Sequence, residues 1–322
     1  MVRNFQSAWA GAYNLFDTAW GHAVIQPARQ LWNRTVAAKF LASLRASPPS
    51  AIVTTHFFPA DVAATAKRAG WLKSPLIVVI TDLAPHRFWL APQADLFVVA
   101  TPRTAEICEA RGVPRERLRV IGIPVAPRFA NVPSQADAVT RLGLDPSRRT
   151  VLLASGGMGV GPLPQLLRAM LGEVAEGAVP TQFAVICGEN RELAEQLHRQ
   201  TRDAPAPVRV LGFVDNMPEW MAAADIMVTK AGGLTITEAL AVGVPMVLTG
   251  NIPGQEQMNA EYAARHGAAV SAQQPIEAAR LVAGLLRDAE RLDALRRAAR
   301  RLGRPDAANE IARLVLDAAA AA

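Results

Sequence analysis

The order of apolar and polar residues divides the chain into stretches with helical periodicity and stretches typical of buried strands. Residues 2–45 have the helical period, with aromatic side chains three or four positions apart on one face. This aromatic stripe consists of Phe5, Trp9, Tyr13, Phe16 and Trp20. From Ala51 onward, short apolar runs alternate with helical stretches. This alternation is typical of βαβ units with parallel strands.

The apolar runs form two series on either side of a proline-containing segment. The first series comprises residues 52–55, 76–81, 96–100 and 118–121. The second series comprises residues 151–154, 183–187, 208–211, 226–229 and 245–248. Prolines at 124, 127 and 133 argue against a helix between the two series. We therefore predict an α/β protein with two Rossmann-like domains facing a cleft. The first domain is residues 1–123, the linker is 124–135, and the second domain is 136–322, closed by helices from residue 276.

Length and cysteine content narrow the class of protein. No apolar run in the 322 residues reaches the ~18 residues that a membrane-spanning helix needs. The first residues lack the charged and apolar regions of a signal peptide. Cys108 and Cys187 lie in separate apolar stretches, which favours a reduced, cytosolic protein. Two cysteines and scattered histidines do not form a metal-ligand pattern, so no metal site is expected.

Positive charge is concentrated in the first part of the chain. Residues 1–130 contain 15 Lys and Arg against 7 Asp and Glu, whereas residues 131–322 contain 19 against 21. A basic front half favours an anionic partner, either membrane headgroups or nucleic acid. A solvated basic surface without a partner would produce the same distribution. The aromatic stripe also has two interpretations, because it would suit a membrane interface or a position beneath the first sheet.

The segment after the fourth apolar run of the second series carries the strongest chemical signal. Gly232 and Gly233 stand at a predicted strand-to-helix turn, where backbone N–H groups can approach a phosphate. Thr235 adds a hydroxyl, and Lys230 adds a point charge for a diphosphate. Glu238 would lie within the first turn of that helix, where a carboxylate can accept hydrogen bonds from two ribose hydroxyls. The alternative is a capping box, with Thr235 as N-cap and Glu238 three residues later.

A second polar segment follows the next apolar run. Gln255, Glu256 and Asn259 carry amide and carboxylate groups that suit the hydroxyls of a sugar. Gln255 and Asn259 are four residues apart and would share a helix face. Ligands of open α/β sheets bind at the carboxyl ends of the strands, where both segments are expected. A polar helix start after a Pro-Gly turn would give the same pattern.

These segments resemble the donor domain of the processive diacylglycerol glucosyltransferases and the monogalactosyldiacylglycerol synthases. They are similar, less closely, to the enzyme that adds N-acetylglucosamine to the lipid-linked peptidoglycan precursor. The resembling segments of the second half are 155–159, 212–214, 230–241, 243–245, 253–256, Asn259 and 267–269. Those of the first half are Thr55, His56, Thr81, Asp82, His86, Trp89, 122–125 and Phe129. The resemblance covers roughly residues 50–300 and implies the GT-B fold.

The resemblance also implies a reaction and a set of binding residues. The expected reaction transfers a hexose from a UDP-sugar, UDP-glucose or UDP-galactose, to a lipid hydroxyl with inversion at the anomeric carbon. It implies no cofactor beyond the UDP-sugar co-substrate and no metal, so Lys230 and the helix N-terminus would stabilise the leaving diphosphate. The glycine turns would hold the diphosphate, Phe213 and Val214 the base, Glu238 the ribose, and Gln255 with Glu256 the hexose. The UDP-sugar site would comprise Gly156, Gly157, Phe213, Val214, Lys230, Gly232, Gly233, Leu234, Thr235, Glu238, Gly254, Gln255, Glu256 and Asn259.

The first domain departs from the family pattern. The family opens with a strand and a Gly-x-Gly-His loop whose histidine is a candidate base, and the first strand here corresponds to a later one. We therefore expect an incomplete first domain, which either an upstream start or a truncated protein would explain. His22 lies too close in sequence to Thr55 to replace the missing histidine. His86 with Asp82 is the candidate catalytic pair, and His56 also follows a predicted strand.

Three functions remain open from the sequence. The first is an inverting hexosyltransferase that acts on a lipid, most readily diacylglycerol, in an anionic membrane. The second is a UDP-N-acetylglucosamine epimerase, which shares the fold, and the third is a non-catalytic UDP-sugar-binding remnant. For the first function we expect a cytoplasmic, peripheral protein on the inner face of the cell membrane that does not bind nucleic acid. The hexose, the lipid and the oligomeric state stay open.

Overall fold

The computed structural model describes residues 36–157, 161–175, 179–250 and 255–321. The predicted aromatic stripe, His22 and Gly254 lie outside these residues. Contacts divide the chain into two compact units. The first unit comprises Met1–Pro124, Pro253–Gln255 and Asp306–Ala322, and the second comprises Val125–Ile252 and Glu256–Pro305.

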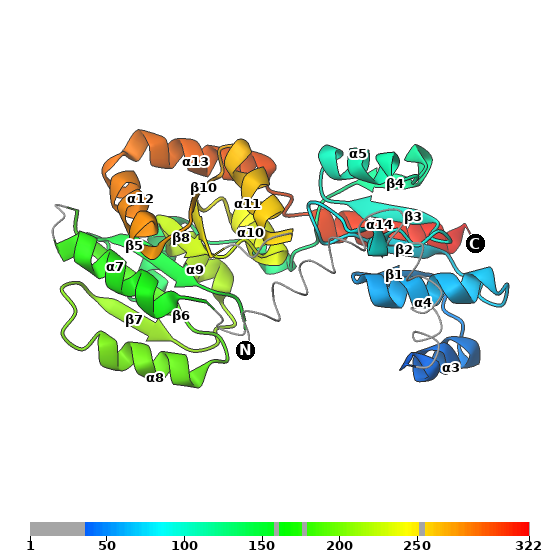
Figure 1. Cartoon of the computed structure of the whole chain (residues 1–322), viewed down its shortest axis with the longest axis horizontal. Coiled ribbons are helices and arrows are strands. Elements are labelled where there is room, and N and C mark those ends of the chain that lie inside the picture. Colours follow the sequence, from blue (N-terminus) through cyan, green and yellow to red (C-terminus); the bar gives the residue numbers. More distant parts are fainter. Residues whose placement is uncertain (1–35, 158–160, 176–178, 251–254, 322) are drawn as a thin grey trace. The chain divides into compact units, whose positions relative to one another are not determined.

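The first unit is built on a four-stranded parallel sheet whose strands pair in chain order (Figure 1). The strands are β1 (Ile52–Thr54), β2 (Leu76–Val79), β3 (Leu96–Val99) and β4 (Leu118–Val120). The helices described in this unit are α3 (Ala38–Ala46), α4 (Phe57–Arg68), η1 (Arg87–Trp89), α5 (Pro102–Ala110), η2 (Arg115–Arg117) and α14 (Ala307–Ala320). The apolar side chains of β2 alternate between two hydrophobic clusters, as expected of a strand that is covered on both faces.

The last helix, α14, packs on the first unit (Figure 1). Ile311 is buried against Ile77, Val79 and Val98, which share one face of the first sheet. The sequence analysis assigns this helix to the second domain, because it follows the helices of that domain in the chain. Its apolar stripe predicts a buried face but does not say which sheet buries it.

The second unit is a six-stranded parallel sheet in the order β10-β9-β8-β5-β6-β7. Its strands are β5 (Arg149–Ala154), β6 (Thr181–Ile186), β7 (Val208–Leu211), β8 (Ile226–Thr229), β9 (Met246–Thr249) and β10 (Ala269–Ala272). The helices are η3 (Pro127–Phe129), α6 (Gln135–Arg141), α7 (Leu163–Ala175), α8 (Arg191–Gln200), α9 (Met217–Ala223), α10 (Gly233–Val242), α11 (Gln255–Arg265), α12 (Pro275–Arg287) and α13 (Ala289–Leu302). Two hydrophobic clusters cover the two faces of the sheet, as in a doubly wound fold.

The observed strands coincide with the predicted apolar runs, and β10 is an addition. Its sequence, Ala-Val-Ser-Ala, contains one β-branched residue and one polar residue, so it gives a weak strand signal. Parallel pairing with β9 over four residues stabilises the extended conformation of β10, which its own sequence favours only weakly. Among the described helices, none is long and apolar enough to cross a membrane.

The docking of α14 can be tested on the helix itself. Ile311→Ala should lower the free energy of unfolding of the first unit by about 2–4 kcal/mol, because it leaves a cavity against β2 and β3. Leu316→Ala on the same helix should change it by less than about 0.5 kcal/mol, because Leu316 is 69% exposed. Calorimetry of the full-length chain measures both. Equal effects of the two substitutions would contradict the docking.

Candidate active site

The second sheet reverses its strand order between β5 and β8. The chain adds β6 and β7 on one side of β5, and β8, β9 and β10 on the other. Ala154 and Thr229 are paired in register, so the turns that follow these two strands begin side by side. A reversal of this kind opens a crevice at the carboxyl ends of the strands, where ligands of open α/β sheets bind.

The turn after β5 is shaped for close backbone approach. Gly156 has a φ of +80°, which favours glycine, and the Gly157 carbonyl accepts a hydrogen bond from the Glu189 N–H at 2.9 Å. A Cβ on Gly188 would lie 2.1 Å from that carbonyl oxygen, so the loop after β6 fixes the turn. The hydroxyl of Ser155 is buried and has no hydrogen-bond partner among the described residues. A buried hydroxyl beside a glycine turn is a suitable donor for an anionic ligand.

The turn after β8 supplies a cation and a helix N-terminus. Lys230 lies over the glycine turn, since its Cε is 3.8 Å from the position that a Cβ on Gly156 would take. Its Nζ forms an ion pair with Glu256 Oε1 at 3.2 Å. Gly232 is the N-cap of α10, and no side chain caps this end. The uncapped N–H groups and the helix dipole favour an anion at this position.

The capping-box alternative does not describe this helix. The helix begins at Gly233, so Thr235 lies inside its first turn and Glu238 inside its second. Thr237, not Thr235, makes a local side-chain hydrogen bond, from Oγ1 to the Gly233 carbonyl at 2.8 Å. Thr235 and Leu234 are therefore placed at the start of the helix without a capping role, and Leu234 is exposed.

Glu238 is the second-turn carboxylate of α10. Burial raises its pKa above the ordinary value, and the positive charge of Arg128 opposes that rise. Phe213 and Val214, predicted to flank the base, follow β7, and Phe213 is 68% exposed. Val214 packs against the hydrophobic cluster that contains Ile236 of α10. Arg128 was not singled out by sequence analysis, because η3 brings it to Glu238 only in the folded chain.

The predicted sugar-binding residues of α11 have different surroundings. Asn259 is buried, and its Nδ2 donates to the Ala231 carbonyl at 3.0 Å, which ties α11 to the turn after β8. Glu256 is the partner of Lys230. Gln255 groups with the first unit, where its Nε2 donates to Asp82 Oδ2 at 2.5 Å.

Asp82 is a partly buried carboxylate at the carboxyl end of β2. Its Oδ2 also accepts from Trp89 Nε1 at 2.6 Å. Burial raises the pKa of Asp82, while the Trp89 hydrogen bond and the charge of His56 lower it. A carboxylate with a raised pKa that is still held ionised by partners is suited to accept a proton.

The two histidines of the first unit both cap short helices. His86 is buried, and its Nδ1 accepts from the Phe88 N–H at 3.1 Å at the start of η1. His56 Nδ1 accepts from the Phe58 N–H at 3.2 Å at the start of α4. Each ring thus uses Nδ1 to accept a backbone N–H at the start of its helix. Of the predicted pair, Asp82 is therefore the group with the chemistry of a base.

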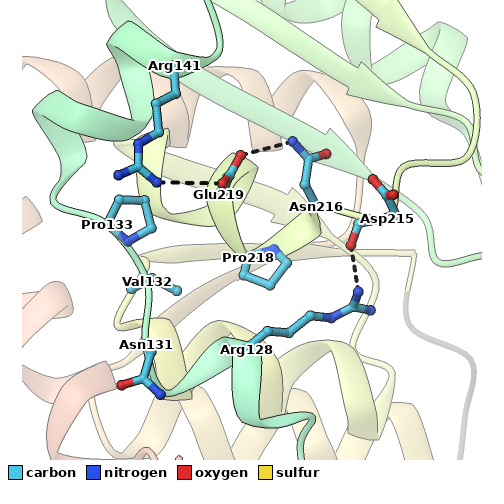
Figure 2. Close-up of a pocket in the computed structure, with 9 residues that line it drawn as sticks. All are labelled: Arg128, Asn131, Val132, Pro133, Arg141, Asp215, Asn216, Pro218 and Glu219. Carbon is cyan, nitrogen blue, oxygen red and sulfur yellow. Dashed lines mark hydrogen bonds and ion pairs between the residues drawn. The ribbon is translucent and has the colours of Figure 1, made fainter.

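A hollow of about 500 Å³ lies on the second unit, beside the turn after β7 (Figure 2). Arg128 Nη1 donates to the Asp215 carbonyl at 2.7 Å, and Arg141 pairs with Glu219 at 3.9 Å. Asn216 Nδ2 donates to the same Glu219 at 3.1 Å. The lining residues are Arg128, Asn131, Val132, Pro133, Arg141, Asp215, Asn216, Pro218 and Glu219.

Comparison with known proteins agrees with this arrangement. The family described as glycosyltransferase family 28 C-terminal domain matches residues 150–311, half of the chain, and monogalactosyldiacylglycerol (MGDG) synthase matches residues 2–125. A processive diacylglycerol beta-glucosyltransferase of Bacillus cereus is 30% identical over 275 residues, which cover 85% of this chain and 69% of that protein. The chain belongs to this glycosyltransferase family.

Other curated relatives are longer than the chain. A processive diacylglycerol beta-glucosyltransferase of Staphylococcus epidermidis is 33% identical over 254 residues, and the chain spans 63% of its length. Among solved structures, Acinetobacter baumannii MurG has a TM-score of 0.66 at 19% identity and covers 86% of this chain and 76% of its own. The UDP-GlcNAc 2-epimerase of Neisseria meningitidis has the same TM-score at 12% identity and covers 88% and 81%. These two likenesses establish the GT-B fold.

Within residues 36–157, 161–175, 179–250 and 255–321, no three His, Cys, Asp or Glu side chains are grouped so as to hold a metal ion. The cations and donors around the two glycine turns are Lys230, the uncapped start of α10 and Ser155.

The fit between Gly188 and the glycine turn can be tested by substitution. Gly188→Ala would place a methyl group 2.1 Å from the Gly157 carbonyl oxygen, at a φ of +59°, so the turn must move. We expect UDP affinity to fall at least roughly tenfold, about 1.4 kcal/mol. Gly172→Ala on α7 is the control, because a Cβ there meets no atom within 4 Å. Calorimetric titration with UDP measures both, and unchanged affinity in Gly188→Ala would contradict the assignment of the turn.

Proposed function

We propose that this glycosyltransferase transfers a hexose from UDP-glucose or UDP-galactose to a hydroxyl of a membrane lipid, most readily diacylglycerol. The proposal is supported by two relatives of the chain, which are processive diacylglycerol beta-glucosyltransferases. The observation that carries it is the pair of turns after β5 and β8, where Ser155, Lys230 and the start of α10 suit a diphosphate.

Each part of the donor has a suitable partner. The diphosphate would lie between the glycine turns, and Glu238 would accept hydrogen bonds from the two ribose hydroxyls. Phe213, whose ring is exposed, would cover the base. Glu256 would exchange its ion pair with Lys230 for hydroxyls of the hexose when the diphosphate binds Lys230.

The reaction requires a single displacement. The acceptor oxygen forms a bond to the anomeric carbon, the bond from that carbon to the diphosphate oxygen breaks, and the electron pair leaves with UDP. The proton of the acceptor hydroxyl passes to Asp82. Lys230 and the N–H groups of α10 stabilise the charge that develops on UDP, so no metal or other cofactor is required.

The acceptor places the enzyme at a membrane. The excess of Lys and Arg in residues 1–130 would hold the first unit against anionic headgroups. Exposed charges are screened by salt, so this attachment should weaken as ionic strength rises. We therefore propose a peripheral protein on the inner, anionic face of the cell membrane that has no nucleic-acid partner.

The function is tested with labelled UDP-glucose and UDP-galactose on vesicles of diacylglycerol and anionic phospholipid. We expect labelled glycolipid, and Asp82→Asn should reduce its formation by roughly 10²–10⁴-fold with UDP affinity unchanged. Because burial raises the pKa of Asp82, wild-type activity should fall as pH decreases through that raised value, where the carboxylate takes up a proton. If a labelled epimer of the UDP-sugar forms without glycolipid, the protein is an epimerase. If neither donor gives a product, the protein binds UDP-sugars without catalysing a reaction.

The ribose contact is tested separately. Glu238→Gln keeps the size of the side chain and removes its charge, so UDP affinity should fall by about 1.5–3 kcal/mol. The preference for UDP over 2′-deoxy-UDP should disappear in this variant, because the second hydroxyl loses its carboxylate. Glu261→Gln on α11 is the control, since Glu261 is exposed and pairs with Arg265 at the surface. Calorimetry with the two nucleotides measures this, and a preserved preference would remove Glu238 from the ribose site.

A further inference from the structure

Arg128 stands where the linker enters the second unit. It lies in η3, and its neighbour Phe129 is buried in the core of that unit. Figure 2 shows the Arg128 side chain reaching along the hollow to the turn after β7. There Nη1 donates to the Asp215 carbonyl at 2.7 Å, only two residues after Phe213. The buried Phe129 therefore fixes the backbone from which Arg128 reaches this turn.

The same guanidinium acts on Glu238. Helix α10 packs against η3, α9 and α13. Among the charged side chains on these elements, Arg128 is the one that lowers the pKa of Glu238. Glu219 on α9 is paired with Arg141 and Asn216. On α13, Arg300 lies against Gly243, at the opposite end of α10 from its N-terminus.

We propose that Arg128 is a positioning residue of the nucleotide site, which fixes the turn after Phe213 and supplies the positive charge against which Glu238 acts as a carboxylate. One cation would thus serve the base side and the ribose side of the same nucleotide. The proposal rests on the proposed function, since it concerns a UDP-sugar donor. It adds a residue outside the two glycine turns and outside the predicted site.

Burial and the charge of Arg128 have opposite effects on the pKa of Glu238. Burial takes Glu238 partly out of water, which favours its protonated form. A protonated carboxyl accepts hydrogen bonds from hydroxyls more weakly than a carboxylate does. Removing Arg128 leaves burial unopposed, so the pKa of Glu238 rises further. Loss of UDP-sugar affinity on acidification should then begin at a higher pH. Because Arg128 is exposed, its effect should also shrink as salt is added.

The test is UDP-glucose affinity by calorimetry at about pH 5.5 and about pH 8, which bracket the range where a raised carboxyl pKa acts. UDP-glucose is used because its diphosphate has no phosphate group that takes up a proton in this range. Wild type, Arg128→Gln, Arg128→Lys and Arg141→Gln are compared. Arg141 is the matched control, since it lines the same hollow and pairs with Glu219.

We expect Arg128→Gln to weaken binding roughly five- to tenfold at the higher pH and by a further severalfold at the lower pH. The ratio of the two dissociation constants should thus exceed that of wild type. Arg128→Lys should restore the wild-type ratio, because it keeps the charge, and Arg141→Gln should leave the ratio unchanged. A wild-type ratio in Arg128→Gln would overturn the proposal.

Further results distinguish failure of this inference from failure of the proposed function and from misfolding of a variant. In the Glu238→Gln background, Arg128→Gln should no longer change the pH ratio, and a change there would overturn the proposal. If Arg128→Gln does not fold, Arg128→Lys tests the proposal in its place. A ratio of the two dissociation constants in Arg128→Lys that differs from that of wild type would contradict a role for the charge. Failure of the wild-type protein to bind UDP-glucose would instead refute the proposed function.

Discussion

The candidate site depends on the pairing of β5 with β8. In a doubly wound sheet the strands that flank the order reversal send their connections to opposite faces, so the turns after them diverge and leave a crevice. Ala154 and Thr229 stand opposite each other in that pairing. The groups that suit a diphosphate, Ser155, Lys230 and the start of α10, all lie within a few residues of the ends of β5 and β8. A shift in register by one residue would turn each buried side chain of β8 to the other face and move both turns.

The helix that completes the site is held at the end remote from its N-terminus. Gly303, after α13, lies so close to α10 that a Cβ there would be 2.4 Å from the Leu240 carbonyl oxygen. Such backbone contact leaves α10 no freedom to slide along its axis. Packing against α13 therefore places the N-terminus of α10, the end proposed to bind the diphosphate, and its own first turn can stay uncapped. Uncapped N–H groups cost stability in an empty helix and become useful when an anion binds them.

Much of the architecture was predictable because the buried strands are rich in β-branched residues and are separated by amphipathic helices. The turn after β5 was recognised from its resemblance to the family's glycine loop, and the structure gives Gly156 a φ of +80°, which favours glycine. The sequence could not assign α14 to a sheet, since amphipathicity describes one face of a helix and not its partner. Nor could it separate Asp82 from His86. Both follow β2, and only the folded chain shows that the His86 ring caps η1 while Asp82 accepts a hydrogen bond from Trp89.

Arg128 illustrates the same limit for electrostatics. Its place in the linker, beside two prolines, suggests a stiff connection and nothing about charge. Asp82 and Glu238 are both carboxylates whose pKa burial raises, and in each case partner side chains oppose the rise. For Asp82 the partners are a hydrogen bond from Trp89 and the charge of His56, and for Glu238 the partner is Arg128. In both groups desolvation is the larger effect, so the pKa stays raised although the partner opposes the rise. The two groups thus obtain their different proposed roles, taking a proton and holding hydroxyls, from surroundings that no local sequence motif contains.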